Sequence, residues 1–137
     1  MARDKFHYEV KLALVYDGWD VTDAPLYMKI GTIPLHIDLG AEKIIDAEKD
    51  GEKIAVEVKT FGILSFITAF HEAVGKYIVY REALAIRESD RVLYLAMPND
   101  VYEEYGSELL VQRVLANNKI KIILYESSTQ HIVSWLK

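Results

Sequence analysis

The spacing of apolar side chains along the chain predicts four helices. Residues 4–16 carry apolar side chains three and four positions apart, as one face of a helix requires, and Asp17-Gly18 ends the stretch. The same spacing continues through residues 65–87, which predicts a long amphipathic helix. Residues 100–105 and 108–117 have shorter helical patterns. Most of the remaining apolar stretches are too short for helices.

Those stretches predict strands. They are residues 19–22, 34–41, 43–49, 53–60, 91–97, 120–125 and 132–136, while 26–31 is either a loop or a further short strand. Asp50-Gly51 is the strongest hairpin signal in the chain. The order of elements predicts an α/β fold, in which a mixed sheet with flanking helices forms one domain over residues 1–137.

Composition narrows the compartment and the kind of metal site. No apolar stretch approaches the ~20 residues of a membrane span, and the first residues do not resemble a signal peptide, so a cytoplasmic protein is expected. The 137 residues include no cysteine, which excludes disulfides and thiolate ligands. Any bound metal is therefore expected to be a hard ion, Mg²⁺ or Mn²⁺.

The formal net charge of −5 argues against a protein that holds nucleic acid by overall electrostatic attraction. It does not exclude a nuclease, because carboxylates that bind a metal make the chain acidic until the cation is present. The basic residues that are candidates for phosphate contacts are Arg81, Arg87, Arg91, Lys5, Lys11 and Lys76. The alternative is that they are dispersed solubilising charges.

Glu57 and Lys59 lie two residues apart on the predicted strand 53–60. Successive side chains of a strand point to opposite faces, so this pair shares one face with Ala55, and its Cα atoms lie roughly 7 Å apart. If Asp50-Gly51 forms a two-residue turn, Asp46 faces Ala55 and Glu42 faces Lys59. The acidic residues on the face of the pair are then Asp46, Glu48 and, if its strand has no bulge, Asp38. A three-residue turn would break this parity.

Such a face suits the hydrolysis of phosphodiesters. Mg²⁺ binds carboxylate oxygens and substrate phosphate, it stabilises the charge of the transition state, and it generates hydroxide from water. An ammonium group beside the carboxylates, here Lys59, can hold the attacking water or neutralise developing charge. The alternative is that Glu57 and Lys59 belong to the solvated face of an ordinary hairpin, where cross-strand ion pairs contribute only ~0.2–1 kcal/mol.

Longer stretches of the chain carry a family resemblance. They are Lys5-Phe6-His7, Val10-Lys11-Leu12-Ala13-Leu14, Asp17-Gly18-Trp19, Pro25-Leu26, Asp38-Leu39-Gly40-Ala41-Glu42, Ala47-Glu48-Lys49, the stretch from Lys53 to Phe61, Phe70-His71, Gly75-Lys76-Tyr77, Tyr80-Arg81 and the stretch from Arg91 to Pro98. In their order and spacing they resemble the XisH family, the excision controlling factors of the fdxN element in cyanobacteria. The resemblance extends nearly from end to end of the chain.

The XisH family in turn resembles the PD-(D/E)XK superfamily, so the resemblance implies a restriction-endonuclease-like fold. In that pattern an acidic residue on one hairpin strand joins a Glu-x-Lys on the next, which Glu57 and Lys59 match. For the first acid we favour Asp38, with Glu48 as a further metal ligand, and Asp46 is the competing candidate. The implied site thus has Asp38, Glu57 and Lys59 as catalytic residues and Asp38, Glu48 and Glu57 as ligands of Mg²⁺ or Mn²⁺.

Several other residues are secondary candidates. Lys76 and Tyr80 resemble the Gln-x-x-x-Tyr helix motif of some nucleases of this superfamily, or they form an ordinary exposed pair. Glu9 is either an additional acid of the site or a solvated helical glutamate. His7 and His71 contact phosphate or metal, or they make local hydrogen bonds.

Two functions follow from the resemblance. The first is a DNA-processing accessory factor that controls excision of a DNA element and acts as a Mg²⁺-dependent endonuclease. The second is a non-catalytic regulator on the same scaffold, which acts with a small XisI-like partner protein. Trp135 and Tyr125 near the C-terminus would either seal a homodimer or complete the core.

Overall fold

The computed structural model describes residues 2–43, 51–62 and 65–137. In chain order the elements are α1 (Ala2–Tyr16), β1 (Asp20–Asp23), β2 (Leu26–Ile30), β3 (Ile33–Ile37), β4 (Leu39–Lys43), β5 (Glu52–Val58), α2 (Phe66–Arg87), β6 (Arg91–Pro98), α3 (Asn99–Tyr105), α4 (Leu109–Asn117), β7 (Ile122–Glu126) and β8 (His131–Leu136). The four predicted helices are confirmed, and residues 26–31, for which a loop was the alternative, contain a strand.

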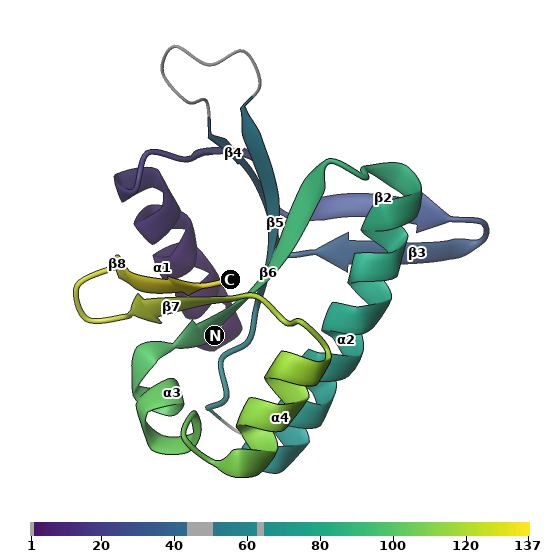
Figure 1. Cartoon of the computed structure of the whole chain (residues 1–137). Helices are drawn as coiled ribbons and strands as arrows, with labels where there is room; N and C mark the ends of the chain where they lie inside the picture. The colour runs from purple at the N-terminus through teal and green to yellow at the C-terminus, as the bar shows by residue number, and fades with distance from the viewer. Residues whose placement is uncertain (1, 44–50, 63–64) are drawn as a thin grey trace.

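The main sheet has six strands in the order β1-β4-β5-β6-β7-β8. Its centre is parallel, because β5, β6 and β7 run in the same direction, while β1, β4 and β8 pair antiparallel with their neighbours. The predicted mixed sheet with flanking helices is therefore confirmed. A separate two-stranded sheet of β2 and β3, here called the ribbon, projects from the body beside the end of α2 (Figure 1).

Side chains of β5 point alternately to the two faces of the sheet, and both faces are packed in the core. Val56 packs in a cluster with Val10 and Leu14 of α1, whereas Ala55 packs in a second cluster with Tyr77 and other residues of α2. Because β5 is covered on both faces, its residues from Ile54 to Val58 are all buried. Within the described ranges, none of the helices is both long and apolar enough to cross a membrane.

The single strand predicted over 34–41 is wrong, because the chain forms two strands that meet at Asp38. Ile37 and Leu39 would share a face in a continuous strand. Instead, Ile37 lies in the α2 cluster and Leu39 in the α1 cluster, on opposite faces of the main sheet. The chain leaves the ribbon at Ile37 and enters the main sheet at Leu39, so burying both side chains requires a break between them.

The predicted hairpin register is also wrong. Glu42 pairs with Lys53 rather than with Lys59, and the partner of Ala55 is Gly40 rather than Asp46. Asp46 and Glu48 lie outside the described residues, as does most of the predicted strand 43–49. Asp50-Gly51 therefore did not set the register of this strand pair, whose Leu39 and Val56 lie directly opposite each other and are both fully buried.

Tyr77 ties α2 to two strands through its hydroxyl. The phenol donates a hydrogen bond to the Leu93 carbonyl oxygen at 2.8 Å and accepts one from the Lys121 N–H at 3.1 Å. The side chain is 1% exposed, and burial is the main cause that raises the pKa of its hydroxyl. The hydroxyl therefore stays protonated and can make both bonds.

We expect Tyr77→Phe to lower the free energy of unfolding by about 1–3 kcal/mol, because it leaves a buried carbonyl and an amide without this partner. Tyr8→Phe is the matched control, since Tyr8 is 59% exposed, and we expect a change within about 0.5 kcal/mol. Urea unfolding followed by circular dichroism measures both. Equal stability of the two variants would contradict the role of the Tyr77 hydroxyl.

Candidate active site

Asp38 lies at the break between β3 and β4 and is 7% exposed. Its Oδ2 accepts a hydrogen bond from the Val58 N–H at 3.1 Å. His7 Nε2 lies 2.9 Å from the Asp38 carbonyl oxygen, to which the tautomer protonated at Nε2 donates a hydrogen bond. Both ends of the residue are thereby fixed, one to β5 and the other to α1.

Glu57 lies beside Asp38 in the neighbouring strand. The antiparallel ladder ends with the pair of Leu39 and Val56, and Asp38, the residue directly before β4, accepts the hydrogen bond from the Val58 N–H. Glu57 lies between Val56 and Val58, so Asp38 lies next to it. Glu57 is 5% exposed, which is rare for a carboxylate. The structure thus brings together two buried acidic residues that were predicted for the site, at the carboxyl end of a parallel strand, where ligands of open α/β sheets commonly bind.

Lys59 follows directly after β5, and its N–H donates to the Ala96 carbonyl oxygen at 3.1 Å. Its ammonium group forms an ion pair with the Glu72 carboxylate of α2, with Nζ and Oε2 2.5 Å apart. The side chain of Lys59 is 18% exposed and that of Glu72 is 48% exposed. The hydrogen bond and the charge of Lys59 hold the pKa of Glu72 below its ordinary value, and the charge of Lys76 lowers it further.

The donor set fits a hard cation. Asp38 and Glu57 offer carboxylate oxygens, and Mg²⁺ typically binds one or two carboxylates and completes its shell with water and substrate phosphate. Within residues 2–43, 51–62 and 65–137, no group of three or more acidic, histidine or cysteine side chains is placed to hold a metal. Asp46 and Glu48, the other predicted acids, lie outside these ranges.

The helix candidates separate in the structure. Lys76 is exposed one turn after Glu72, close enough for its charge to act on that carboxylate. Tyr80 is half-buried and packs against the α2 cluster, so it is not part of an exposed pair. Lys76 therefore lies on the side of α2 that faces the Lys59–Glu72 pair, while Tyr80 belongs in part to the core.

The remaining candidates lie at different distances from the site. Glu9 is 7% exposed, so its interpretation as a solvated glutamate is wrong. The residue lies on the α1 side of the sheet. Among the described residues, its Oε2 has no hydrogen-bond partner. Burial and then the charge of Glu9 raise the pKa of Tyr125. His7 contacts Asp38 directly, whereas His71 is exposed between α2 and α4.

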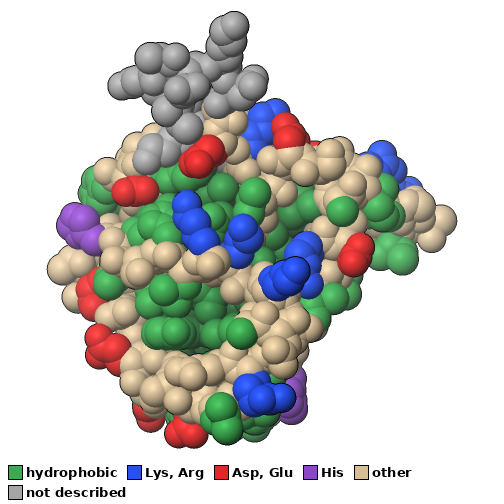
Figure 2. Space-filling view, in the orientation of Figure 1, with side chains coloured by type: hydrophobic (Ala, Val, Ile, Leu, Met, Phe, Trp, Pro, Cys, Tyr) green, Lys and Arg blue, Asp and Glu red, His purple; other side chains and the backbone are tan. Residues whose placement is uncertain are grey.

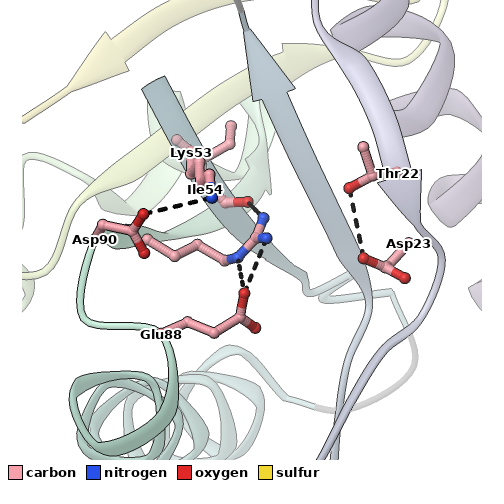
Figure 3. Close-up of polar contacts among 7 residues, drawn as sticks. Thr22, Asp23, Lys53, Ile54, Glu88 and Asp90 are labelled. Carbon is pink, nitrogen blue, oxygen red and sulfur yellow. Dashed lines mark hydrogen bonds and ion pairs between the residues drawn. The ribbon is translucent and has the colours of Figure 1, made fainter. Parts of the chain in front are cut away.

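Three of the arginines considered for phosphate contacts have structural partners. Arg91 is 8% exposed and donates hydrogen bonds to the Ile54 carbonyl oxygen and to the Glu88 carboxylate. Ile54 and Glu88 are labelled in Figure 3. Arg81 donates to carbonyl oxygens after α4, and Arg87 donates to one in the ribbon. On the face shown in Figure 2, lysine and arginine side chains form a short row between hydrophobic areas. A broad basic surface is not seen there.

Sequence reasoning missed Glu72 as a residue of the site. It is 13 positions from Lys59, and helical periodicity alone gives it a boundary position beside the buried Ala69 and Ala73. That position was the available signal, since the edge of the apolar face of a helix lies close to the surface on which the helix packs. The partner itself required the packing of α2 on the sheet.

We expect Glu72→Gln to destabilise the protein at pH 7 and to destabilise it less at pH 3. The folded pKa of Glu72 is below its ordinary value of 4.5, so its stabilising contribution is fully present above pH 4.5 and is lost as pH falls through the folded value. Urea unfolding at both pH values measures this. The control is Glu82→Gln, an exposed glutamate of the same helix; an equal loss at pH 3 and pH 7 would rule out the ion pair as the cause.

Comparison with known proteins identifies the family. The model of the XisH protein family matches residues 1–133. The crystal structure of an XisH family protein from Nostoc punctiforme PCC 73102 is similar over 98% of this chain and 100% of that chain, with 39% identity and a TM-score of 0.90.

A second crystal structure, of an fdxN element excision controlling factor protein from Anabaena variabilis, shares 40% identity over 98% of this chain and 100% of that chain, with a TM-score of 0.89. A search of curated proteins found no match. The family model matches nearly the whole chain, and both crystal structures have the same fold over 98% of it. This chain therefore belongs to the XisH family.

Proposed function

We propose that this protein is a DNA-processing factor that controls excision of a DNA element, and that Asp38, Glu57 and Lys59 form a Mg²⁺-dependent centre for phosphodiester hydrolysis. One observation carries the proposal: at the strand break the Asp38 carboxylate accepts a hydrogen bond from the N–H of Val58, the residue directly after the buried Glu57, and Lys59 follows just past the end of β5. Buried carboxylates close to a lysine at a strand end are a common feature of functional sites.

The Anabaena variabilis relative supports the first half of the proposal. It is called an fdxN element excision controlling factor and shares 40% identity over 98% of this chain. Excision of a DNA element breaks and rejoins phosphodiester bonds, so phosphodiester chemistry is relevant to the process that this relative is named for. Two oxygen ligands and one cation are groups that suit this chemistry.

The arrangement also supports a relation to the PD-(D/E)XK nucleases. In that pattern an acid on one strand faces a Glu-x-Lys on the adjacent antiparallel strand. Asp38 precedes β4 and Glu57 lies on β5, which are antiparallel neighbours. In the proposal Asp38 is the first acid, and the observed register removes the argument that favoured Asp46.

Each residue has a distinct task. Asp38 and Glu57 hold Mg²⁺, and Asp38 is oriented for this by the Val58 N–H and by the contact of its main chain with His7. When bound, the cation stabilises charge on the phosphate and favours ionisation of the attacking water. Lys59 exchanges its Glu72 partner for a phosphate oxygen and neutralises charge there.

A non-catalytic regulator that acts with an XisI-like partner protein is the second candidate. It is favoured by the ion pair of Lys59 and Glu72, which occupies the ammonium group that hydrolysis needs. This candidate predicts a stable complex with the partner protein that forms without Mg²⁺.

Supercoiled plasmid distinguishes the two candidates. We expect the wild type to nick or cut it with Mg²⁺ and not with EDTA, and Glu57→Gln and Lys59→Ala each to lower the rate at least about a hundredfold, because each removes a group that stabilises the transition state. Glu103→Gln, an exposed glutamate on α3, is the matched control.

Thermal unfolding checks that the variants fold. Wild-type cleavage no faster than that of the folded Glu57→Gln protein would end the catalytic proposal. In that event, co-elution with an XisI-like protein in EDTA would establish the non-catalytic candidate, and failure to co-elute would leave neither form of the proposal standing.

A further inference from the structure

Both tryptophans of the chain line one cleft, at the end of β5 opposite to Glu57 and Lys59. The cleft has a volume of about 690 Å³ and includes Trp19, Trp135 and Tyr94. The Trp135 ring lies 5.7 Å from Trp19, at an interplanar angle of 33°, and meets Tyr94 edge-on at 5.0 Å and 86°. The three rings pack together as an aromatic wall, in which Trp19 and Tyr94 are buried and Trp135 is partly exposed. Neither proposed function uses this wall.

The rim of the cleft carries more negative than positive charge. Its carboxylates are Asp17, Glu52 and Asp90, and its ammonium groups are Lys53 and Lys137. Lys53 is paired with Asp90, with Nζ and Oδ2 3.5 Å apart, as Figure 3 shows. Asp17 accepts a hydrogen bond from the Trp19 indole N–H at 3.2 Å, so one carboxylate is fixed directly beside the aromatic wall.

The charge of Glu52 affects a second residue of the aromatic wall, Tyr94. Burial is the main cause that raises the pKa of Tyr94, and the charge of Glu52 raises it further. The negative potential of Glu52 therefore reaches the Tyr94 hydroxyl. A ring face has a negative quadrupole of its own, so the potentials of the wall and the rim both favour a cation.

This chain already places a cation there. Lys137 Nζ lies 6.0 Å from the centroid of the Trp135 ring, at the outer limit of a cation–π contact. Because the contact is long, the ammonium group is a weak occupant that a better-fitting cation can displace. Its position shows that the exposed face of Trp135 is open to a charged group.

We propose that this cleft binds a basic segment of a partner polypeptide, with an arginine or lysine head group on Trp135 in the place of Lys137. Glu52 and Asp17 supply the opposite charges. A single head group would fill only a small part of 690 Å³, and the carboxylates are distributed around the rim. Both facts favour successive side chains of an extended peptide over a small free amine. The site is independent of the proposed phosphodiester chemistry.

Tryptophan fluorescence reports on this cleft alone, because both tryptophans line it. The intact protein is titrated with an acetylated, amidated peptide of alternating glycine and arginine, with the same peptide containing citrulline, and with acetyl-arginine amide. We expect a saturable change with the arginine peptide, and at most a weak one with the citrulline peptide, which keeps the shape and lacks the charge. Calorimetry on the same samples detects binding that leaves fluorescence unchanged.

Substitutions test the sign of the charge. Lys137→Ala removes the internal competitor, so we expect it to tighten the arginine peptide about threefold, and Glu52→Gln to weaken it about threefold. Glu103→Gln, far along the chain on α3, should leave binding unchanged. Weaker binding of the arginine peptide by Lys137→Ala would overturn the proposal, because it would mean that Lys137 contributes to binding instead of competing with the peptide.

Two further outcomes also decide the matter. Equal affinity for the citrulline peptide, or binding by neither method, would overturn the cation site. Equal affinity for acetyl-arginine amide and for the peptide would overturn the polypeptide assignment, since a single head group would then account for all of the binding. Tighter binding of the peptide, with affinity that falls as salt is raised, would support it.

Discussion

The hydrogen bond from the Val58 N–H to the Asp38 carboxylate connects the two parts of the fold. It forms where the chain passes from the ribbon into the main sheet, between Ile37 on one face and Leu39 on the other. Because the Asp38 carboxylate accepts this hydrogen bond, the Val58 N–H has a partner at the point where the β4–β5 ladder ends. The same bond fixes a carboxylate beside Glu57. Asp38 therefore belongs both to the connection between the ribbon and the main sheet and to the candidate site.

The two ends of β5 have different chemistry as a result. At its carboxyl end, Asp38, Glu57 and Lys59 gather under α2, and the Glu72 carboxylate holds the ammonium group of Lys59. At its amino end, the two tryptophans and acidic residues line the open cleft, together with the exposed Val92 of β6. The core of β5 between them is apolar on both faces, which keeps the two polar regions apart.

Sequence patterns predicted the helices and the mixed sheet because those elements follow from local periodicity. Residues 65–87 could be assigned from one stripe of apolar residues, and Ser65 caps that helix by accepting a hydrogen bond from the Thr68 N–H at 3.3 Å. The pair of Glu57 and Lys59 was likewise visible as a local pattern. Asp38 was proposed from family resemblance, and the structure places it beside that pair.

What sequence reasoning did not predict depends on contacts between distant parts of the chain. The break at Asp38 follows from burial of Ile37 and Leu39 in different clusters, and no property of the stretch 34–41 by itself requires it. The Asp50-Gly51 signal gave a wrong register because the opposed, fully buried pair of Leu39 and Val56 is a stronger constraint than a turn preference. Glu72 and the buried position of Glu9 could be recognised only after α1 and α2 were packed on the sheet.

Anomalous diffraction from crystals soaked in Mn²⁺ tests the central claim most directly, because it locates the ion without requiring turnover. The account predicts one strong peak within coordination distance of both Asp38 and Glu57, about 2.0–2.3 Å from their oxygens, and loss of that peak in Glu57→Gln crystals. A peak that involves Asp46 without Asp38, or no peak at these residues at saturating Mn²⁺, would contradict it.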